Sequence, residues 1–130
     1  MKQVVTSDHA PAAIGPYSQA IAANGLLFVS GQIPLDPKTG ALLDGDTAAQ
    51  ARLVLSNLQA ILTAAGLGFE HVVRSTIFLV DLGDFAAVNA VYSEFVPAPY
   101  PARVTIQVAA LPRGSRVEID AIAAFPAESR

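Results

Sequence analysis

One apolar stripe between residues 47 and 66 limits the folds open to this chain more than any other feature of its sequence. Asp46 and Thr47 open the segment, with Gln50 spaced to complete a capping box, and Gly66 supplies a C-terminal stop. Apolar residues recur on one helical face, at Ala51, Leu55, Leu58, Leu62 and Ala65. A helix with a single apolar face must bury that face, so the stripe predicts a core helix packed on another element.

The remainder of the chain is predicted to form short strands and one further helix. Asn24-Gly25 is a strong hairpin signal, and Asp84 is placed to cap a second helix that ends at Phe95. Strands are expected at residues 18–23, 26–30, 72–80, 103–108 and 116–125. This order of strands, helix, strand, helix and strands predicts one α+β domain over residues 1–130, with both helices on one face of a sheet.

The second face of that sheet has no further helix to cover it. The chain has 130 residues, enough for one core and too few for two ordinary domains. Its residues are 52% hydrophobic and 15% charged, against roughly 25% charged in an average globular protein. Few charged side chains are left to coat the uncovered face, so we expect other subunits to cover it in an oligomer.

Charge and residue usage narrow the classes of function. The formal net charge is -3 and the eight Lys and Arg are scattered, so nucleic-acid binding has no electrostatic footprint. The absence of Cys excludes a disulfide framework and a thiol nucleophile, and His9 and His71 have no second ligand at metal spacing. Residues 1–6 do not resemble a signal peptide, and no apolar run reaches the roughly 20 residues of a membrane span. We therefore expect a cytoplasmic protein without metal, nucleic acid or membrane partners.

Polar residues of the last two expected strands are the first candidates for a site. We expect these strands to be neighbours, with Ile106 opposite Ile119 and with the apolar residues on the buried face. The other face then carries Arg103, Thr105 and Gln107 beside Glu118 and Asp120. From the pattern alone, a solvated face with ordinary ion pairs explains these residues better than a site does.

Six segments of the chain, taken together, indicate a function more specifically than the polar residues of these two strands do. They are residues 10–19 (APAAIGPYSQ), 29–34 (VSGQIP), 37–40 (PKTG), 84–89 (DFAAVN), 101–103 (PAR) and 111–119 (LPRGSRVEI). In this order, and over nearly the whole chain, they resemble the signatures of the reactive intermediate deaminase family (Rid, YjgF-like). The resemblance implies a chorismate-mutase-like fold, a homotrimer, and sites in the clefts between subunits.

The resemblance also implies site residues. Arg103 would hold a substrate carboxylate, because a planar guanidinium matches a carboxylate through two bonds at once. Glu118 would orient or deprotonate the attacking water. The further substrate-binding positions are Tyr17, Ser30, Gly31 through its backbone, Asn89, and Thr105, where many bacterial relatives carry Cys. Each has a plainer alternative, such as an ion pair at the rim for Arg103, a surface ion pair for Glu118, or local packing for Tyr17.

The expected register affects how such a site could be built. It places Arg103 opposite Ile122, four residues beyond Glu118, which separates the two Cα atoms by about 13 Å or more along the hairpin. One small substrate would not touch both residues of a single chain. We therefore expect each cleft to take Arg103 from one subunit and Glu118 from its neighbour.

The implied activity is that of a 2-iminobutanoate/2-iminopropanoate deaminase. Such an enzyme hydrolyses the enamine and imine intermediates 2-aminoacrylate and 2-aminocrotonate to 2-oxo acids and ammonia, and it needs no cofactor. Two other functions remain open. One is a non-catalytic trimer that binds small carboxylates in the same cleft, and the other is a ribonuclease, an activity reported for some relatives, against which the scattered positive charge weighs.

Overall fold

The hairpin at Asn24-Gly25 forms as the sequence predicts and is part of a six-stranded sheet. In the computed structural model, which describes residues 1–127, both turn residues take the left-handed backbone conformation, with φ of 52° and 76°. Asn and Gly adopt this conformation more readily than other residues. The strands are β1 (Gln3–Val5), β2 (Ala20–Ala23), β3 (Leu26–Gln32), β4 (Val72–Leu79), β5 (Ala102–Gln107) and β6 (Val117–Ala124). β1 lies within residues 1–6, where no strand was predicted from the sequence.

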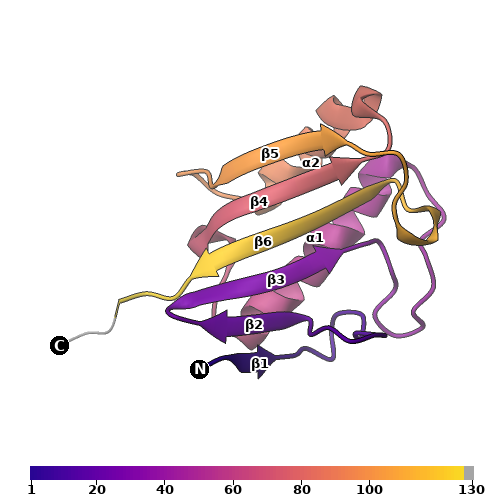
Figure 1. Cartoon of the computed structure of the whole chain (residues 1–130). Helices are drawn as coiled ribbons and strands as arrows, with labels where there is room; N and C mark the ends of the chain where they lie inside the picture. The colour runs from indigo at the N-terminus through magenta and orange to yellow at the C-terminus, as the bar shows by residue number, and fades with distance from the viewer. Residues whose placement is uncertain (128–130) are drawn as a thin grey trace.

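Two helices, α1 (Thr47–Ala64) and α2 (Phe85–Phe95), lie behind the sheet on one face (Figure 1). The α+β fold with both helices on one side is therefore confirmed. The apolar stripe of α1 faces the sheet, since the side chains of Ala51, Leu55, Leu58 and Leu62 are at most 1% exposed. Gly66 ends the helix with φ of 77°, a backbone conformation that residues other than glycine rarely adopt.

The caps of both helices differ from the sequence prediction. Asp46, not Thr47, caps α1: its Oδ1 accepts a hydrogen bond of 2.8 Å from the backbone N–H of Ala49. Because the Asp46 carboxylate already accepts that bond, the Thr47 hydroxyl is free to donate to Asp84 Oδ2 at 2.8 Å. Asp84 does occupy the N-cap position of α2, but its side chain makes no capping bond there. The predicted capping box is thus wrong, and Asp84 joins the two helices instead.

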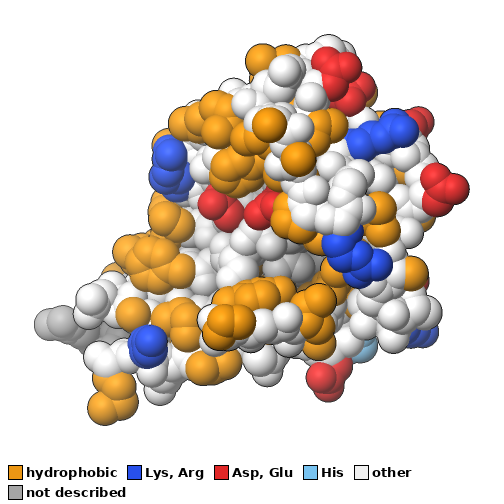
Figure 2. All heavy atoms as spheres, turned by 45° about the vertical axis from the view of Figure 1, so that its right-hand side comes forward, with side chains coloured by type: hydrophobic (Ala, Val, Ile, Leu, Met, Phe, Trp, Pro, Cys, Tyr) orange, Lys and Arg blue, Asp and Glu red, His pale blue; other side chains and the backbone are white. Residues whose placement is uncertain are grey.

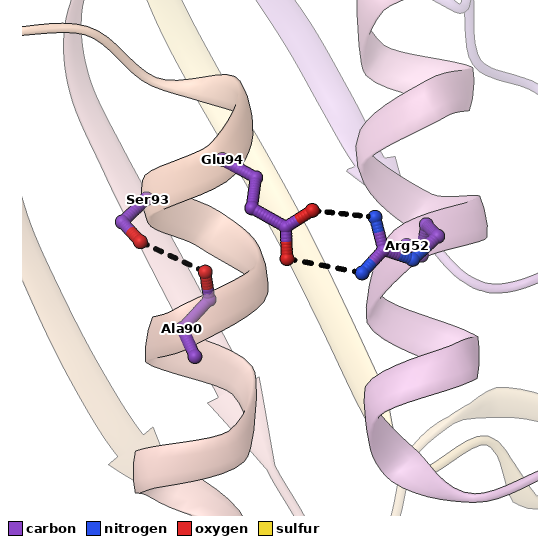
Figure 3. A network of polar contacts seen from close by, with 4 residues as sticks. All are labelled: Arg52, Ala90, Ser93 and Glu94. Atoms are coloured by element: carbon purple, nitrogen blue, oxygen red, sulfur yellow. Dashed lines mark hydrogen bonds and ion pairs between the residues drawn. The ribbon is translucent and has the colours of Figure 1, made fainter.

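A second polar contact joins the exposed sides of the helices (Figure 3). The Arg52 guanidinium on α1 donates two hydrogen bonds, of 2.8 and 3.0 Å, to the Glu94 carboxylate on α2. The residue before Glu94 makes a contact within α2, where the Ser93 hydroxyl donates a hydrogen bond to the carbonyl of Ala90. Both groups of the ion pair are about half exposed, so the pair contributes little to the stability of the fold.

The strand order is β1-β2-β3-β6-β4-β5, so the expected pairing of the last two strands is wrong. β4 lies between β5 and β6: it pairs with β5 in parallel and with β6 antiparallel. Parallel neighbours need a crossover, and α2 supplies it between β4 and β5. β6 then returns to the middle of the sheet, where β3 and β4 satisfy both of its edges.

The helices cover one face of the sheet and leave the other face open. Val117, Ile119, Ala121 and Ala123 of β6 point to the helices and are buried, whereas Phe28, Val104 and Ile106 on the open face are 38–43% exposed. Figure 2 shows hydrophobic side chains over much of the surface in that view, with acidic side chains between them. None of the helices in the described part of the chain is long and apolar enough to cross a membrane.

Candidate functional site

Arg103 and Glu118 lie on opposite faces of the sheet. Side chains of register partners on neighbouring strands point to the same face. Arg103 is the partner of Ser75 and, through it, of Ala121, and these two residues are buried on the helix face. Glu118 is the partner of Phe78 and, through it, of Ile106 on the open face. The prediction that Arg103 and Glu118 share one face is therefore wrong.

The wrong prediction of a shared face has two causes. The inserted strand β4 removes the direct pairing on which the expected register was based. In addition, Val104 and Ile106 point to the open face, where each is more than a third exposed, although apolar side chains were expected to be buried. Their alternation with Arg103 and Thr105 turns those two residues toward the helices.

Arg103 lines a hollow of about 460 Å³ between α2 and the edge strand β5. Its Nη1 donates a hydrogen bond of 2.9 Å to Asn89 Oδ1 on α2. Its Cζ lies 4.9 Å from the centroid of the Tyr92 ring and 5.8 Å from that of Phe85. Within residues 1–127 the only ion pair is Arg52 with Glu94, so neutral groups hold the Arg103 guanidinium. Its remaining N–H groups are available to bind an anion.

Thr105 follows Arg103 on the same face and has an unusual hydroxyl. Its Oγ1 is the one buried side-chain oxygen or nitrogen of the described residues that has no hydrogen-bond partner. Buried polar atoms are nearly always paired, so an unpaired one calls for a bound molecule or a further contact. Its position two residues after Arg103 on β5 agrees with the predicted substrate-binding role without testing it.

Glu118 lines a second hollow, of about 350 Å³, on the other side of the sheet. Tyr17, Gly31 and Arg113 line the same hollow, together with apolar side chains that include Ile14 and Ile33. Gly31 is required by close approach: a Cβ added there would overlap the Glu118 carboxylate and lie only 2.9 Å from its Cδ. The bare backbone of Gly31 therefore makes the room that the Glu118 carboxylate occupies.

Burial raises the pKa of the Glu118 carboxyl, and the neighbouring negative charge of Asp120 raises it further. Asp120 is itself held in place, because its Oδ1 accepts a hydrogen bond of 2.8 Å from the backbone N–H of Thr76. A carboxylate whose pKa lies closer to neutrality is a stronger base for a proton of water. Within residues 1–127 Glu118 makes no ion pair, so the predicted alternative of a surface ion pair with Arg113 or Arg116 is not what the structure shows.

The predicted site residues therefore fall into two groups within one chain. Arg103, Asn89 and Thr105 belong to the helix side, and Tyr17, Gly31 and Glu118 to the open side. Ser30 supports the second group: its hydroxyl donates a bond of 2.6 Å to the carbonyl of Ser18, the residue after Tyr17. It is not among the residues that line the Glu118 hollow.

Tyr92 and Phe85, which contact Arg103, were not identified from the sequence. A signal for Tyr92 was present, because it follows Asn89 by three residues on the same helix and residues at that spacing share a face. Residues 1–127 also contain no group of three or more His, Cys, Asp or Glu side chains placed to hold a metal ion.

Comparisons with known proteins identify the family. The family model described as Endoribonuclease L-PSP matches residues 7–125. The chain is 60% identical over 124 residues to Protein DfrA of Myxococcus xanthus, covering 94% of this chain and 95% of that protein. The chain belongs to the Rid family. This result confirms the resemblance seen in the sequence segments.

Two further proteins are similar to the chain over almost its whole length. The 2-iminobutanoate/2-iminopropanoate deaminase of the mouse is 49% identical over 123 residues, which cover 95% of this chain and 91% of that enzyme. The crystal structure of RidA from an Antarctic Psychrobacter superposes with a TM-score of 0.90 at 45% identity. The match covers 95% of this chain and 99% of the Psychrobacter protein, so the Rid fold extends over almost the whole molecule.

Proposed function

We propose that this Rid protein is a hydrolytic deaminase of 2-imino acids, the reactive products of 2-aminoacrylate and 2-aminocrotonate. The observation that carries the proposal is the pair of half-sites. One is a guanidinium that only neutral groups contact within residues 1–127, and the other is a carboxylate whose pKa is raised beside a glycine. The name of the mouse relative supports the same reaction class.

The proposed chemistry uses one residue from each half-site. Arg103 binds the substrate carboxylate through two parallel hydrogen bonds and so fixes the adjacent C=N carbon. Glu118 takes a proton from water as the water oxygen bonds to that carbon. Proton transfer to nitrogen and cleavage of the C–N bond then release ammonia and leave a 2-oxo acid. General-base assistance of this kind contributes about 10² to 10⁴-fold, roughly 3 to 5 kcal/mol of barrier.

The proposal requires a second subunit. Because Arg103 and Glu118 of one chain face away from each other, a substrate that contacts both must lie between Arg103 of one subunit and Glu118 of its neighbour. We propose a homotrimer of closed threefold symmetry in which the open sheet faces are covered. The exposed Phe28, Val104 and Ile106 supply apolar surface for that contact.

Light scattering tests the assembly. Three chains of 13.5 kDa should scatter as a particle of about 40 kDa at micromolar concentration. A monomer under those conditions would contradict both the trimer and the shared site, since a single chain does not bring the two half-sites together.

A coupled assay tests the activity. A pyridoxal-phosphate dehydratase would generate 2-aminoacrylate, and the decay of this intermediate would be followed with and without the protein. The expected result is faster release of pyruvate and ammonia. Unchanged decay with retained carboxylate binding would instead support the non-catalytic binder, and cleavage of RNA in a parallel reaction would support the ribonuclease. We further propose the cytoplasm, where such dehydratase products form, as the site of action.

A further inference from the structure

We propose that Tyr92 is a positioning residue for Arg103, with Ser75 fixing the Tyr92 ring. This role rests on the proposed function of Arg103 as a carboxylate-binding residue and adds a component that the reaction itself does not require. The contacts behind this role connect strands β4 and β5 with helix α2.

The guanidinium of Arg103 has no acidic group to orient it within residues 1–127, where the only ion pair is Arg52 with Glu94. Asn89 fixes one of its nitrogens through the bond to Oδ1, but a single bond leaves the plane of the guanidinium free to rotate. The aromatic face of Tyr92, 4.9 Å from Cζ, supplies the second constraint. A cation over a ring is attracted by the negative face of the π system.

The Tyr92 ring is itself held in place. Its side chain is 5% exposed, and its hydroxyl shares a hydrogen bond of 2.7 Å with Ser75 Oγ, a side chain that is 2% exposed. Ser75 is also the register partner of Arg103 on β4. Each of the three residues therefore contacts the other two. Arg103 pairs with Ser75 in the sheet, Ser75 shares a hydrogen bond with the Tyr92 hydroxyl, and the aromatic face of Tyr92 lies against Arg103.

The surroundings of Tyr92 favour its neutral phenol form. Burial raises the pKa of Tyr92, and the Ser75 hydrogen bond and the Arg103 charge oppose this only in part. A neutral tyrosine holds the guanidinium without neutralising it, whereas a carboxylate in the same place would compete with the substrate. The arrangement thus orients the cation and leaves its charge for the ligand.

Binding of pyruvate, followed by NMR chemical shifts, tests the role without depending on turnover. Tyr92→Leu should weaken pyruvate binding by about 2- to 30-fold, the range expected for loss of a cation–π contact. The double variant Tyr92→Phe/Ser75→Ala keeps the aromatic face and removes the hydrogen bond that fixes it, so its affinity for pyruvate should lie between those of wild type and Tyr92→Leu. In the coupled assay, Tyr92→Leu should raise KM more than it lowers kcat, as expected for uniform binding.

Phe95→Leu is the matched control, because Phe95 lies on the same helix and packs against Phe69, away from Arg103. Its binding of pyruvate should equal that of wild type. Should Tyr92→Leu fail to fold, Tyr92→Met also removes the aromatic ring, and its flexible side chain adapts better to an irregular space. Wild-type affinity in a folded ring-less variant, or equal losses in Phe95→Leu and Tyr92→Leu, would overturn the proposal, as would failure of the wild type to bind pyruvate. Binding that depends on Tyr92 in a protein without deaminase activity would refute the proposed function alone.

Discussion

Arg103 and Glu118 are three residues apart in strand register and point to opposite sides of one sheet, with β4 between their strands. Strand spacings of about 4.8 Å across the sheet and about 3.3 Å per residue along it separate their Cα atoms by about 14 Å. The separation resembles that expected from the sequence, but its cause is different. The opposed faces, rather than an offset along a hairpin, require a neighbouring subunit for any site that uses both residues.

This geometry predicts complementation between two inactive variants. Arg103→Ala and Glu118→Gln homotrimers should each be inactive, because each lacks one half of every cleft. When the two chains are unfolded and refolded together, random assembly should leave about a quarter of the clefts in a cyclic trimer intact. The coupled assay should then recover activity in that proportion. A mixture that remains inactive after verified co-assembly would place both residues of the site in one chain.

Arg103→Ala should lower kcat/KM by roughly 10²-fold or more, the effect of removing one partner of a desolvated charge pair. Arg103→Lys should recover little of this loss, since a point charge cannot form two parallel bonds to a carboxylate. Stability should change by only about 1 kcal/mol in Arg103→Ala, as Arg103 is partly exposed. Arg52→Ala, which removes a guanidinium from the far side of the helices, is the control and should keep full activity.

Gly31→Ala should damage activity much more than stability. The added methyl group would overlap the Glu118 carboxylate, the flexible end of a side chain, so the carboxylate can move aside while the strand remains in place. A displacement of about 1 Å in a catalytic group can lower the rate by about 10²-fold. In the coupled assay, the double variant Gly31→Ala with Glu118→Gln should be no less active than Glu118→Gln alone. Additive losses would show that Gly31 acts independently of Glu118.

Asp120→Asn should shift the acid limb of the kcat/KM profile to lower pH. The negative charge of Asp120 raises the pKa of Glu118, so removing that charge lowers the pKa. Glu118 acts as a base in its ionised form, and the variant should therefore stay active at a pH where the wild type is already protonated. Rate profiles of the two proteins, measured from acid to neutral pH across this limb, provide the comparison. An acid limb at the same pH in both proteins would contradict the role of Glu118 as the base.

Stability should depend on Glu118 in a related way. Because the folded-state pKa of this carboxyl is raised, the folded protein loses stability as the pH rises from the unfolded-state pKa through the folded one. Glu118→Gln should thus unfold at a higher temperature than wild type at neutral pH, and the difference should shrink as the pH falls through that window. Thermal unfolding at two pH values checks the sign, and a variant that is less stable than wild type at neutral pH would contradict it.

Local patterns in the sequence were sufficient to predict the helices, the hairpin and the α+β class. The α1 stripe and the Asn24-Gly25 turn depend on residues a few positions apart, so their periodicity and backbone preferences determine them directly. The family segments identified Arg103 and Glu118 as candidates in the same way, from their immediate neighbours in the chain.

Strand order and the direction of each strand face were decided only by the tertiary structure. Insertion of β6 between β3 and β4 depends on contacts between residues far apart in the chain, which no local pattern encodes. β5 has apolar side chains on its open face and packs Arg103 against the Tyr92 ring, so alternation alone could not tell its two faces apart. The division of the candidate site into two half-sites follows from that one orientation, because the register of β5 turns Arg103 away from Glu118.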